Sequence, residues 1–228
     1  KSAAPAPGVA PATADAFEVL GHPVDTDRFA PANGGEGDRT VVLAVTRLVP
    51  EKGLLYVLDA IAPILRDTGA VKFHVLGSGS MRTHLQRRTE LLGVDDSVRF
   101  LGTVPHKQVP RVLQTADIFV NHAVANSHWE EFFGVANLEA MACSVPPVVS
   151  DCGGITYAIR NKQVAEIVPQ RSVTDIRAAI QRLLEDPERR RRMGQRAREY
   201  VKEHYSIERI ADRYHGMVQE TVGPQEPV

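Results

Sequence analysis

Apolar residues recur along most of this chain in two patterns, as short continuous runs and as longer stretches with helical spacing. The run VVLAV is continuous, which is typical of a parallel-sheet strand that is covered on both faces. Strands are predicted over 40–46, 71–76, 98–101, 118–121, 147–150 and 164–168. Helical stretches alternate with them, over 54–66, 81–92, 107–115, 134–142 and 154–160. Because parallel strands need a crossover and helices are the usual crossover, this alternation predicts a doubly wound parallel sheet of the α/β, Rossmann-like class.

The two ends of the chain depart from this alternation. The first fifteen residues, KSAAPAPGVAPATAD, are rich in Ala and Pro and have no periodicity. We therefore expect a tail or linker over 1–23 and one domain over 24–222. Three C-terminal helices are predicted, over 173–184, from Pro187 onward, and over 207–218. The Arg run in the second is interleaved with acids, which favours a solvated helix face over a nucleic-acid patch.

Composition narrows the class of protein. The 228 residues are 43% hydrophobic, enough for one ordinary core, and the formal net charge is −1. Such a balance gives no overall basic field, so nucleic acid is not expected as a partner. The apolar runs have the length of strands, and the expected location is the cytoplasm or the cytosolic face of a membrane. Cys143 and Cys152 lie in apolar surroundings typical of free buried thiols.

Candidate binding residues follow the first two predicted strands. Arg47 and Lys52 share one loop, and their charges suit the oxygens of a diphosphate. Gly77 and Gly79 form a small-residue turn in which backbone can approach a ligand closely. This turn lacks the third glycine of a dinucleotide fingerprint, which makes a dehydrogenase a distant alternative. Ligands of such sheets bind beyond the carboxyl ends of the strands.

An acidic pair marks the junction into the predicted helix over 134–142. Glu131 and Glu139 are eight positions apart, so both can approach one face if the first lies just before the helix. Phe133 and Gly134 lie between them, where free helix N-terminal amides would face an anion. Two acids on a helix surface are the alternative. The histidines nearby match no common zinc spacing, so no metal and no cofactor are expected.

Several segments together resemble one family: TRLVPEKG, VKFHVLGSGS, VRFLGTVPHKQVPRVLQTADIFV, EEFFGVANLEAMAC, PPVVSDCGG and the closing helices. From about residue 24 to 214 the chain resembles the nucleotide-sugar-binding C-terminal domain of retaining family 4 glycosyltransferases, which have the GT-B fold. The resemblance implies a donor domain that uses a UDP-, GDP- or ADP-linked sugar and transfers a hexose to an acceptor hydroxyl with retention, without a metal. It also implies that the acceptor-binding N-terminal domain is absent here, so that this chain alone would be inactive. A missing domain or a partner subunit would then bind the acceptor saccharide, lipid or glycan.

The resemblance also implies a role for each matching residue. Arg47 and Lys52 would neutralise the leaving diphosphate, and Glu131 would orient the hexose, which makes these three the candidate catalytic residues. Glu139 would accept hydrogen bonds from the ribose hydroxyls. The remaining donor contacts would come largely from backbone groups, at Gly77, Gly79, Gly102, Thr103, Val104, Phe133, Gly134 and Val135.

Four positions depart from the usual pattern of this family. Thr46, Phe132 and Ser144 stand where the family commonly has Gly, and Tyr157 stands where Glu is frequent. These departures leave an alternative open, a non-catalytic GT-B-like lobe that serves as a protein-interaction or regulatory module. Only the glycosyltransferase hypothesis predicts nucleotide binding that is lost on charge reversal at Arg47 or Lys52.

Overall fold

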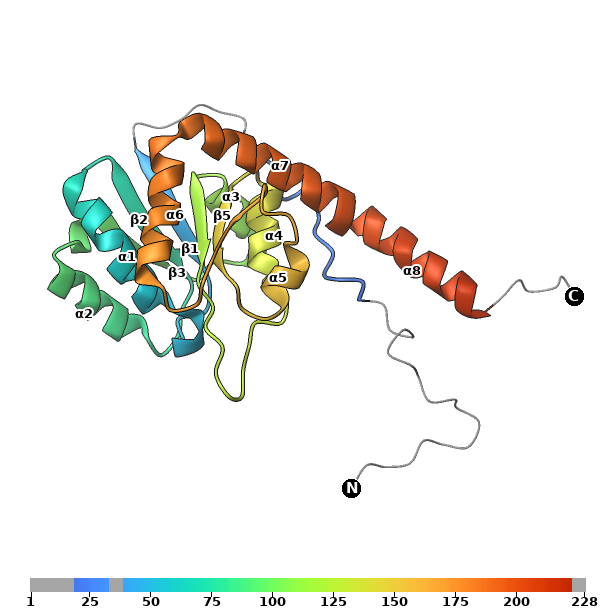
Figure 1. The fold of residues 1–228 in the computed structure, drawn as a ribbon, viewed down its shortest axis with the longest axis horizontal. Helices are drawn as coiled ribbons and strands as arrows, with labels where there is room; N and C mark the ends of the chain where they lie inside the picture. Colours follow the sequence, from blue (N-terminus) through green and yellow to red (C-terminus); the bar gives the residue numbers. More distant parts are fainter. Residues whose placement is uncertain (1–18, 33–38, 223–228) are drawn as a thin grey trace, which may run out of the picture.

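The computed structural model describes residues 19–32 and 39–222 (Figure 1). Within them a single six-stranded parallel sheet has the order β3-β2-β1-β4-β5-β6. The strands are β1 Thr40–Val45, β2 Val71–Leu76, β3 Val98–Gly102, β4 Ile118–Asn121, β5 Pro147–Ser150 and β6 Glu166–Val168. This sheet confirms the predicted doubly wound α/β class. The order of the strands reverses between β1 and β4, which is where such folds open a crevice for a ligand.

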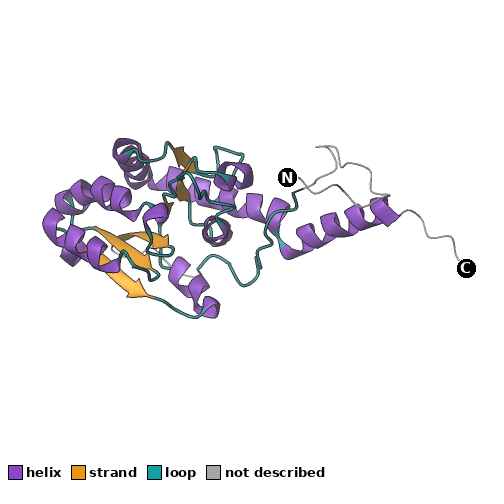
Figure 2. Ribbon diagram, turned by 90° about the horizontal axis from the view of Figure 1, so that it is seen from below, coloured by secondary structure: helices purple, strands orange, loops and turns teal. Residues whose placement is uncertain are grey.

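Helices connect the strands as predicted. They are α1 Leu54–Asp67, α2 Arg82–Leu92, α3 Val109–Leu113, α4 Val135–Ala142, α5 Gly154–Ala158, α6 Val173–Glu185, α7 Pro187–Tyr205 and α8 Ile207–Val222. Short 3-10 turns lie at η2 Pro50–Lys52, η3 Asp95–Ser97 and η4 His106–Gln108. Helix α7 runs along one end of the domain, at the top in Figure 1, and α8 continues away from the body of the domain (Figures 1 and 2).

Three predicted elements are shorter in the structure by two residues or more. The helix expected over 107–115 divides into η4 and α3, because Pro110 has no amide hydrogen to donate within a helix and sits instead in the first turn of α3. The helix expected over 154–160 ends at Ala158, whose carbonyl accepts hydrogen bonds from the Tyr200 and Tyr205 hydroxyls, each at 3.0 Å. The last strand begins at Glu166 rather than at 164.

The sheet separates two apolar cores. Helices α1, α2 and α6 pack on one face, against Val42, Phe73 and other buried strand residues. Helices α3, α4 and α5 pack on the opposite face, against a cluster that includes Leu43 and Phe119. Helix α7 contributes Met193 to the first core and Val201 to the second, so it joins the two layers. This arrangement leaves the loops at the carboxyl ends of the strands free to form a site.

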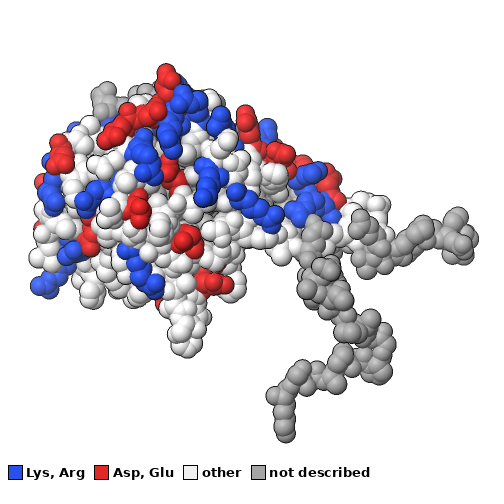
Figure 3. Space-filling view, in the orientation of Figure 1, with Lys and Arg blue, Asp and Glu red and all other residues white. Residues whose placement is uncertain are grey.

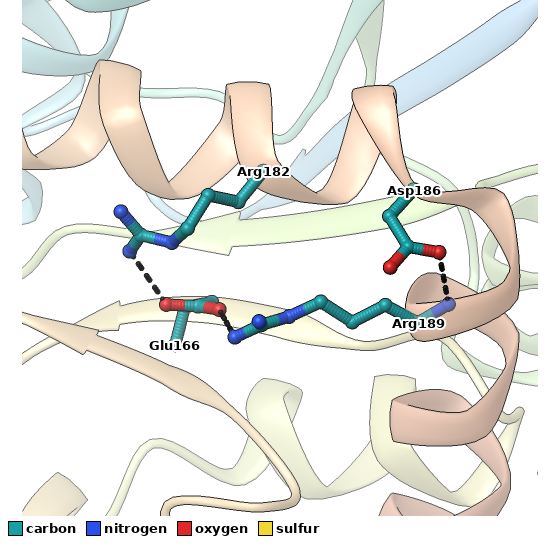
Figure 4. A network of polar contacts seen from close by, with 4 residues as sticks. All are labelled: Glu166, Arg182, Asp186 and Arg189. Atoms are coloured by element: carbon teal, nitrogen blue, oxygen red, sulfur yellow. Dashed lines mark hydrogen bonds and ion pairs between the residues drawn. The ribbon is translucent and has the colours of Figure 1, made fainter.

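A buried acid fastens the edge strand to the C-terminal helices. Glu166, at the start of β6, is only 9% exposed. Its two carboxylate oxygens accept hydrogen bonds from Arg182 of α6 and Arg189 of α7, each at 2.7 Å (Figure 4). Asp186 accepts a hydrogen bond from the Arg189 backbone amide at 2.8 Å and caps α7. The network therefore joins three elements around one carboxylate.

The segment before β1 is also bound to the domain. Arg198 of α7 donates to the carbonyl oxygens of Phe29, Thr26 and Ala142, the last residue of α4. Residues 19–23 fall in the predicted tail, yet they contact the domain, since the Val19 carbonyl accepts a hydrogen bond from the Tyr157 hydroxyl at 3.3 Å. The rest of the predicted tail, residues 1–18, lies outside the described residues.

Charged side chains of both signs are interspersed over the face seen in Figure 3, including along α7 and α8. In α7 the exposed pair Arg192 and Glu188 is an ion pair one helical turn apart, at 3.1 Å. This pattern is the solvated helix face that the sequence predicts. None of the described helices is both long enough and apolar enough to cross a membrane.

Candidate functional site

The predicted site residues lie in the loops that follow β1, β2, β3 and β4 and at the start of α4. Because all the strands are parallel, these loops meet at one edge of the sheet. The loop between β4 and α4 projects from this edge (Figure 1). The loops after β1 and β4 flank the point at which the strand order reverses.

An ion pair joins those two loops. Lys52, the last residue of η2, contacts a carboxylate oxygen of Glu131, and the two side chains are only 12% and 13% exposed. The Lys52 ammonium also lies 4.9 Å from the centre of the Trp129 ring, a cation–π distance. Gly53 makes this contact possible, since a Cβ there would lie 2.1 Å from the His122 carbonyl oxygen. The predicted cation and the predicted acid therefore meet directly.

Arg47 belongs to a neighbouring pocket of about 240 Å³. Gly77, Thr103 and Val104 also line it, so the loops after β1, β2 and β3 all contribute. Arg47 is exposed, and among the described residues it forms no ion pair. Its guanidinium is therefore free to bind an anion in this pocket.

Gly77 and Gly79, which follow β2, are required by the packing of two loops, which the sequence does not reveal. A Cβ at Gly77 would lie 1.8 Å from the Thr46 carbonyl oxygen, and one at Gly79 would lie 2.3 Å from the Leu48 carbonyl oxygen. Both glycines have positive φ angles, 144° and 157°. They allow the loop after β2 to pack against the loop after β1, which places Gly77 and Arg47 in one pocket.

Helix α4 begins at the centre of the site. Gly134 is its N-cap, with φ of 71°, and no side chain caps the helix, so the amides of Val135 and Ala136 have no capping acceptor. Uncapped amides at a helix N-terminus are donors that an anion can use. The Phe133 side chain packs edge-on against Tyr205 of α7, with ring centres 5.6 Å apart, so it is part of the domain's packing.

The second acid of the pair has a different partner from the first. Glu139 is 7% exposed, and its carboxylate lies 2.7 Å from His106 Nε2. Because Glu131 pairs with Lys52, the two acids do not converge on one atom in this structure. His106 is not among the predicted site residues; it lies 33 residues from Glu139, in a segment from which only Gly102, Thr103 and Val104 are predicted to contact the donor.

Two buried asparagines underlie α4 and were also missed. The Asn121 amide at the end of β4 donates to the Asn137 carbonyl oxygen at 2.8 Å. Among the described residues, the other polar atom of each side chain, Asn121 Oδ1 and Asn137 Nδ2, has no hydrogen-bond partner. Asn at a strand end and in a first helical turn is a recognisable signal, because this edge of an α/β sheet is where polar groups gather.

His122, the first residue after β4, is buried in the core. It is 1% exposed, and its Nε2 accepts a hydrogen bond from the Arg171 backbone amide at 2.9 Å. Burial lowers the pKa of His122 to about 4, so this imidazole is neutral at physiological pH. Within the described ranges, no three His, Cys, Asp or Glu side chains cluster as metal ligands would.

Comparison with known proteins identifies the family of this chain. The model of the family described as "Glycosyl transferases group 1" matches residues 25–200. The chain belongs to the group 1 glycosyl transferases. This confirms the family resemblance found in the sequence.

Curated relatives of this group 1 domain are enzymes about twice its length. It is 30% identical over 186 residues to alpha-D-kanosaminyltransferase of Streptomyces kanamyceticus, covering 82% of this chain and 47% of the relative. It is 32% identical over 197 residues to a GDP-mannose-dependent phosphatidylinositol monomannoside mannosyltransferase of Mycolicibacterium smegmatis, covering 82% of this chain and 52% of that enzyme. The chain thus spans about half the length of the curated relatives it matches.

Solved structures agree on the fold. Anabaena HepE in complex with UDP superposes with a TM-score of 0.81 at 19% identity, over 91% of this chain and 58% of HepE. The C-terminal domain of a group 1 glycosyl transferase from Francisella tularensis, LpcC, gives a TM-score of 0.72 at 21% identity. That comparison covers 81% of this chain and 99% of the LpcC domain. The group 1 chain therefore has the fold of a GT-B C-terminal domain.

Proposed function

We propose that this chain is the donor-binding domain of a retaining glycosyltransferase, which transfers a hexose from a nucleotide diphosphate sugar to an acceptor hydroxyl. The observation that carries the proposal is the convergence of the loop bearing Arg47 and Lys52 with the loop bearing Glu131 and the uncapped start of α4. All of them lie at the carboxyl edge of the sheet, beside the reversal of strand order.

The charges of this edge fit a diphosphate leaving group. Arg47 is free to pair, Lys52 is held close by, and the first amides of α4 offer hydrogen-bond donors. Negative charge accumulates on the diphosphate as the sugar–phosphate bond breaks, so these groups stabilise the transition state more than the ground state. Donor binding then requires Lys52 to share or exchange its partner Glu131, which leaves that carboxylate free to orient the hydroxyls of the sugar.

The rest of the donor lies along the neighbouring loops in this proposal. Glu139, a mostly buried carboxylate, accepts hydrogen bonds from the ribose hydroxyls. The backbone of Gly102, Thr103 and Val104 contacts the base at the pocket that Arg47, Thr103 and Val104 line together. No metal or cofactor takes part, because the two cations and the helix amides supply the positive charge.

The relatives support the substrate class. The mannosyltransferase named above is described as GDP-mannose-dependent, and HepE was solved with UDP and with UDP-glucose. UDP- and GDP-linked sugars are therefore candidate donors, and the family resemblance adds ADP-linked sugars. The acceptor, a saccharide, lipid or glycan, is bound by a further domain or a partner subunit, at the cytosolic side of the cell. We propose that this chain alone is inactive, since acceptor positioning lies outside it.

A second candidate function is a non-catalytic lobe for protein interaction. Phe132, beside Glu131, is 86% exposed, and Tyr157 is 37% exposed. Large exposed apolar side chains at a domain edge favour contact with another protein surface. Nucleotide binding distinguishes the two functions.

Calorimetric titration of the chain with UDP, GDP and ADP tests the proposal. We expect saturable binding of at least one of them, weakened at least tenfold by Arg47→Glu. The matched control is Arg191→Glu, a charge reversal at an exposed position of α7 with no described partner, which should leave the affinity unchanged. Absence of binding by all three at millimolar concentration would favour the non-catalytic lobe.

A further inference from the structure

His106 lies between the loop assigned to the base and the acid assigned to the ribose. It begins η4, two residues after Val104, and its side chain is 63% exposed. Its Nε2 lies 2.7 Å from Glu139 Oε1, while the Glu139 side chain is only 10% exposed. A surface imidazole thus reaches inward to a carboxylate that is otherwise shielded from water.

The second ring nitrogen fixes the direction of this hydrogen bond. Arg28 Nη2 lies 3.4 Å from His106 Nδ1. A guanidinium can only donate, so Nδ1 must accept, and in the neutral imidazole the hydrogen is then on Nε2. His106 therefore donates to Glu139, and one oxygen of that carboxylate, Oε1, is occupied.

The segment before β1 holds the imidazole in place. The Phe29 ring is 2% exposed and packs against His106, with ring centres 5.6 Å apart. The Phe29 amide donates to the Asp25 carbonyl at 2.8 Å, and the Phe29 carbonyl accepts from Arg198 at 3.0 Å. Arg198 also binds the last carbonyl of α4, the helix that carries Glu139. The imidazole and the carboxylate are thus fixed to the same support.

We infer that His106 is a positioning residue for the donor nucleoside, and this inference rests on the proposed function. By holding Oε1, it orients the Glu139 carboxylate so that Oε2 presents its lone pairs to the ribose hydroxyls. A carboxylate held in one rotamer binds a diol more tightly than a mobile one, because less conformational freedom is lost on binding. His106 itself need not touch the donor.

Ribose discrimination tests this role. The probes are whichever of UDP, GDP and ADP the wild-type chain binds, and the 2′,3′-dideoxy form of the same nucleotide, titrated calorimetrically. We expect His106→Ala to weaken binding of the ribonucleotide about tenfold, the loss of one charge-assisted hydrogen bond. Binding of the dideoxy nucleotide should be unchanged, so that the ratio of the two affinities falls.

Two variants separate positioning from a general structural effect. His106→Gln retains an amide donor of similar reach and should restore part of the discrimination. Lys107→Ala, at the adjacent exposed position, should leave both affinities unchanged. An unchanged ratio of the two affinities in His106→Ala, whether both nucleotides bind more weakly or neither does, would overturn the role of His106 but not the proposed function. A wild-type chain that binds no nucleotide would overturn the proposed function and this inference with it.

Discussion

Lys52 and Glu131 neutralise each other across the point where the strand order of the sheet reverses. Both side chains are nearly buried, and the Trp129 ring covers the ammonium. Lys52 and Glu131 therefore form a closed pair, and under the proposed function a diphosphate would compete with Glu131 for Lys52.

This pairing predicts a stability effect that does not depend on any ligand. Lys52→Met should lower the free energy of unfolding by about 1–3 kcal/mol, because the Glu131 carboxylate then lacks its partner in a largely desolvated place. The double variant Lys52→Met with Glu131→Gln should recover most of that loss, since no unpaired charge remains. Urea unfolding of the four proteins of this cycle measures the coupling. Additive losses in the double variant would contradict a direct pair.

Glu166 offers a second stability test, far from the proposed chemistry. Glu166→Gln keeps the shape of the side chain but removes the charge that Arg182 and Arg189 share (Figure 4). We expect a loss of about 1–3 kcal/mol in the free energy of unfolding, with nucleotide affinity unchanged.

The control is Glu188→Gln, which breaks the exposed ion pair with Arg192 within α7. Exposed pairs of this type contribute about 0.5 kcal/mol or less, so the control should be nearly neutral in urea unfolding. If the two variants lose the same stability, burial of Glu166 does not strengthen its pairs.

His122 should make stability depend on pH. Burial lowers its folded-state pKa to about 4, whereas the unfolded chain has the ordinary value of 6.5. Between these values the unfolded state binds a proton that the folded state does not. The contribution of neutral His122 to the free energy of unfolding is therefore complete above pH 6.5. It is lost as the pH falls toward 4, by up to about 3 kcal/mol.

Urea unfolding at pH 7 and at pH 4.5 measures this dependence. His122→Gln should flatten it, because the amide does not titrate, although the variant starts from a lower stability at neutral pH. His204→Gln, at a half-exposed position on α7, is the control and should retain the wild-type dependence. A wild-type slope in His122→Gln would show that other groups cause the acid sensitivity.

The sequence alone predicts the parallel sheet and predicts that the site lies beyond the carboxyl ends of its strands. Continuous apolar runs separated by helical periods permit few other folds, and parallel strands bring their loops to one edge. Arg47 and Lys52 could thus be placed from the end of the first strand, and Glu131 from its spacing to Glu139 at the start of a predicted helix. The structure adds that Lys52 and Glu131 touch.

Other features could not be predicted, because they depend on contacts between distant segments. The His106–Glu139 hydrogen bond follows from how η4 packs above α4, and neither residue type nor spacing indicates it. Gly77 suggests close approach to a ligand, yet its nearest constraint is the Thr46 carbonyl of an adjoining loop. The exposed direction of Phe132 is likewise a property of the folded loop.

Ser144 shows what one departure from the family pattern costs. It follows α4 with φ of 60°, a left-handed conformation that is strained for residues with a Cβ, and the family commonly has Gly there. The backbone cannot relax readily, since α7 packs so closely that a Cβ on Gly194 would lie 2.1 Å from the Ser144 carbonyl oxygen. Ser144→Gly should therefore stabilise the fold by about 0.5–1 kcal/mol, because relief of strain exceeds the added entropy of the unfolded chain.

Thermal unfolding should detect this gain as a rise of about 1–4 °C in Tm. The control is Ser80→Gly, at an exposed turn position whose φ is not in the left-handed region. There the substitution relieves no strain and only adds conformational entropy to the unfolded chain. That control should be neutral or slightly destabilising, by up to about 1 kcal/mol. Because the two substitutions make the same chemical change, the difference between their effects on stability isolates the backbone conformation as the cause. A Ser144→Gly variant that melts below the wild type would mean that the hydroxyl or Cβ of Ser144 stabilises the turn more than its φ angle strains it.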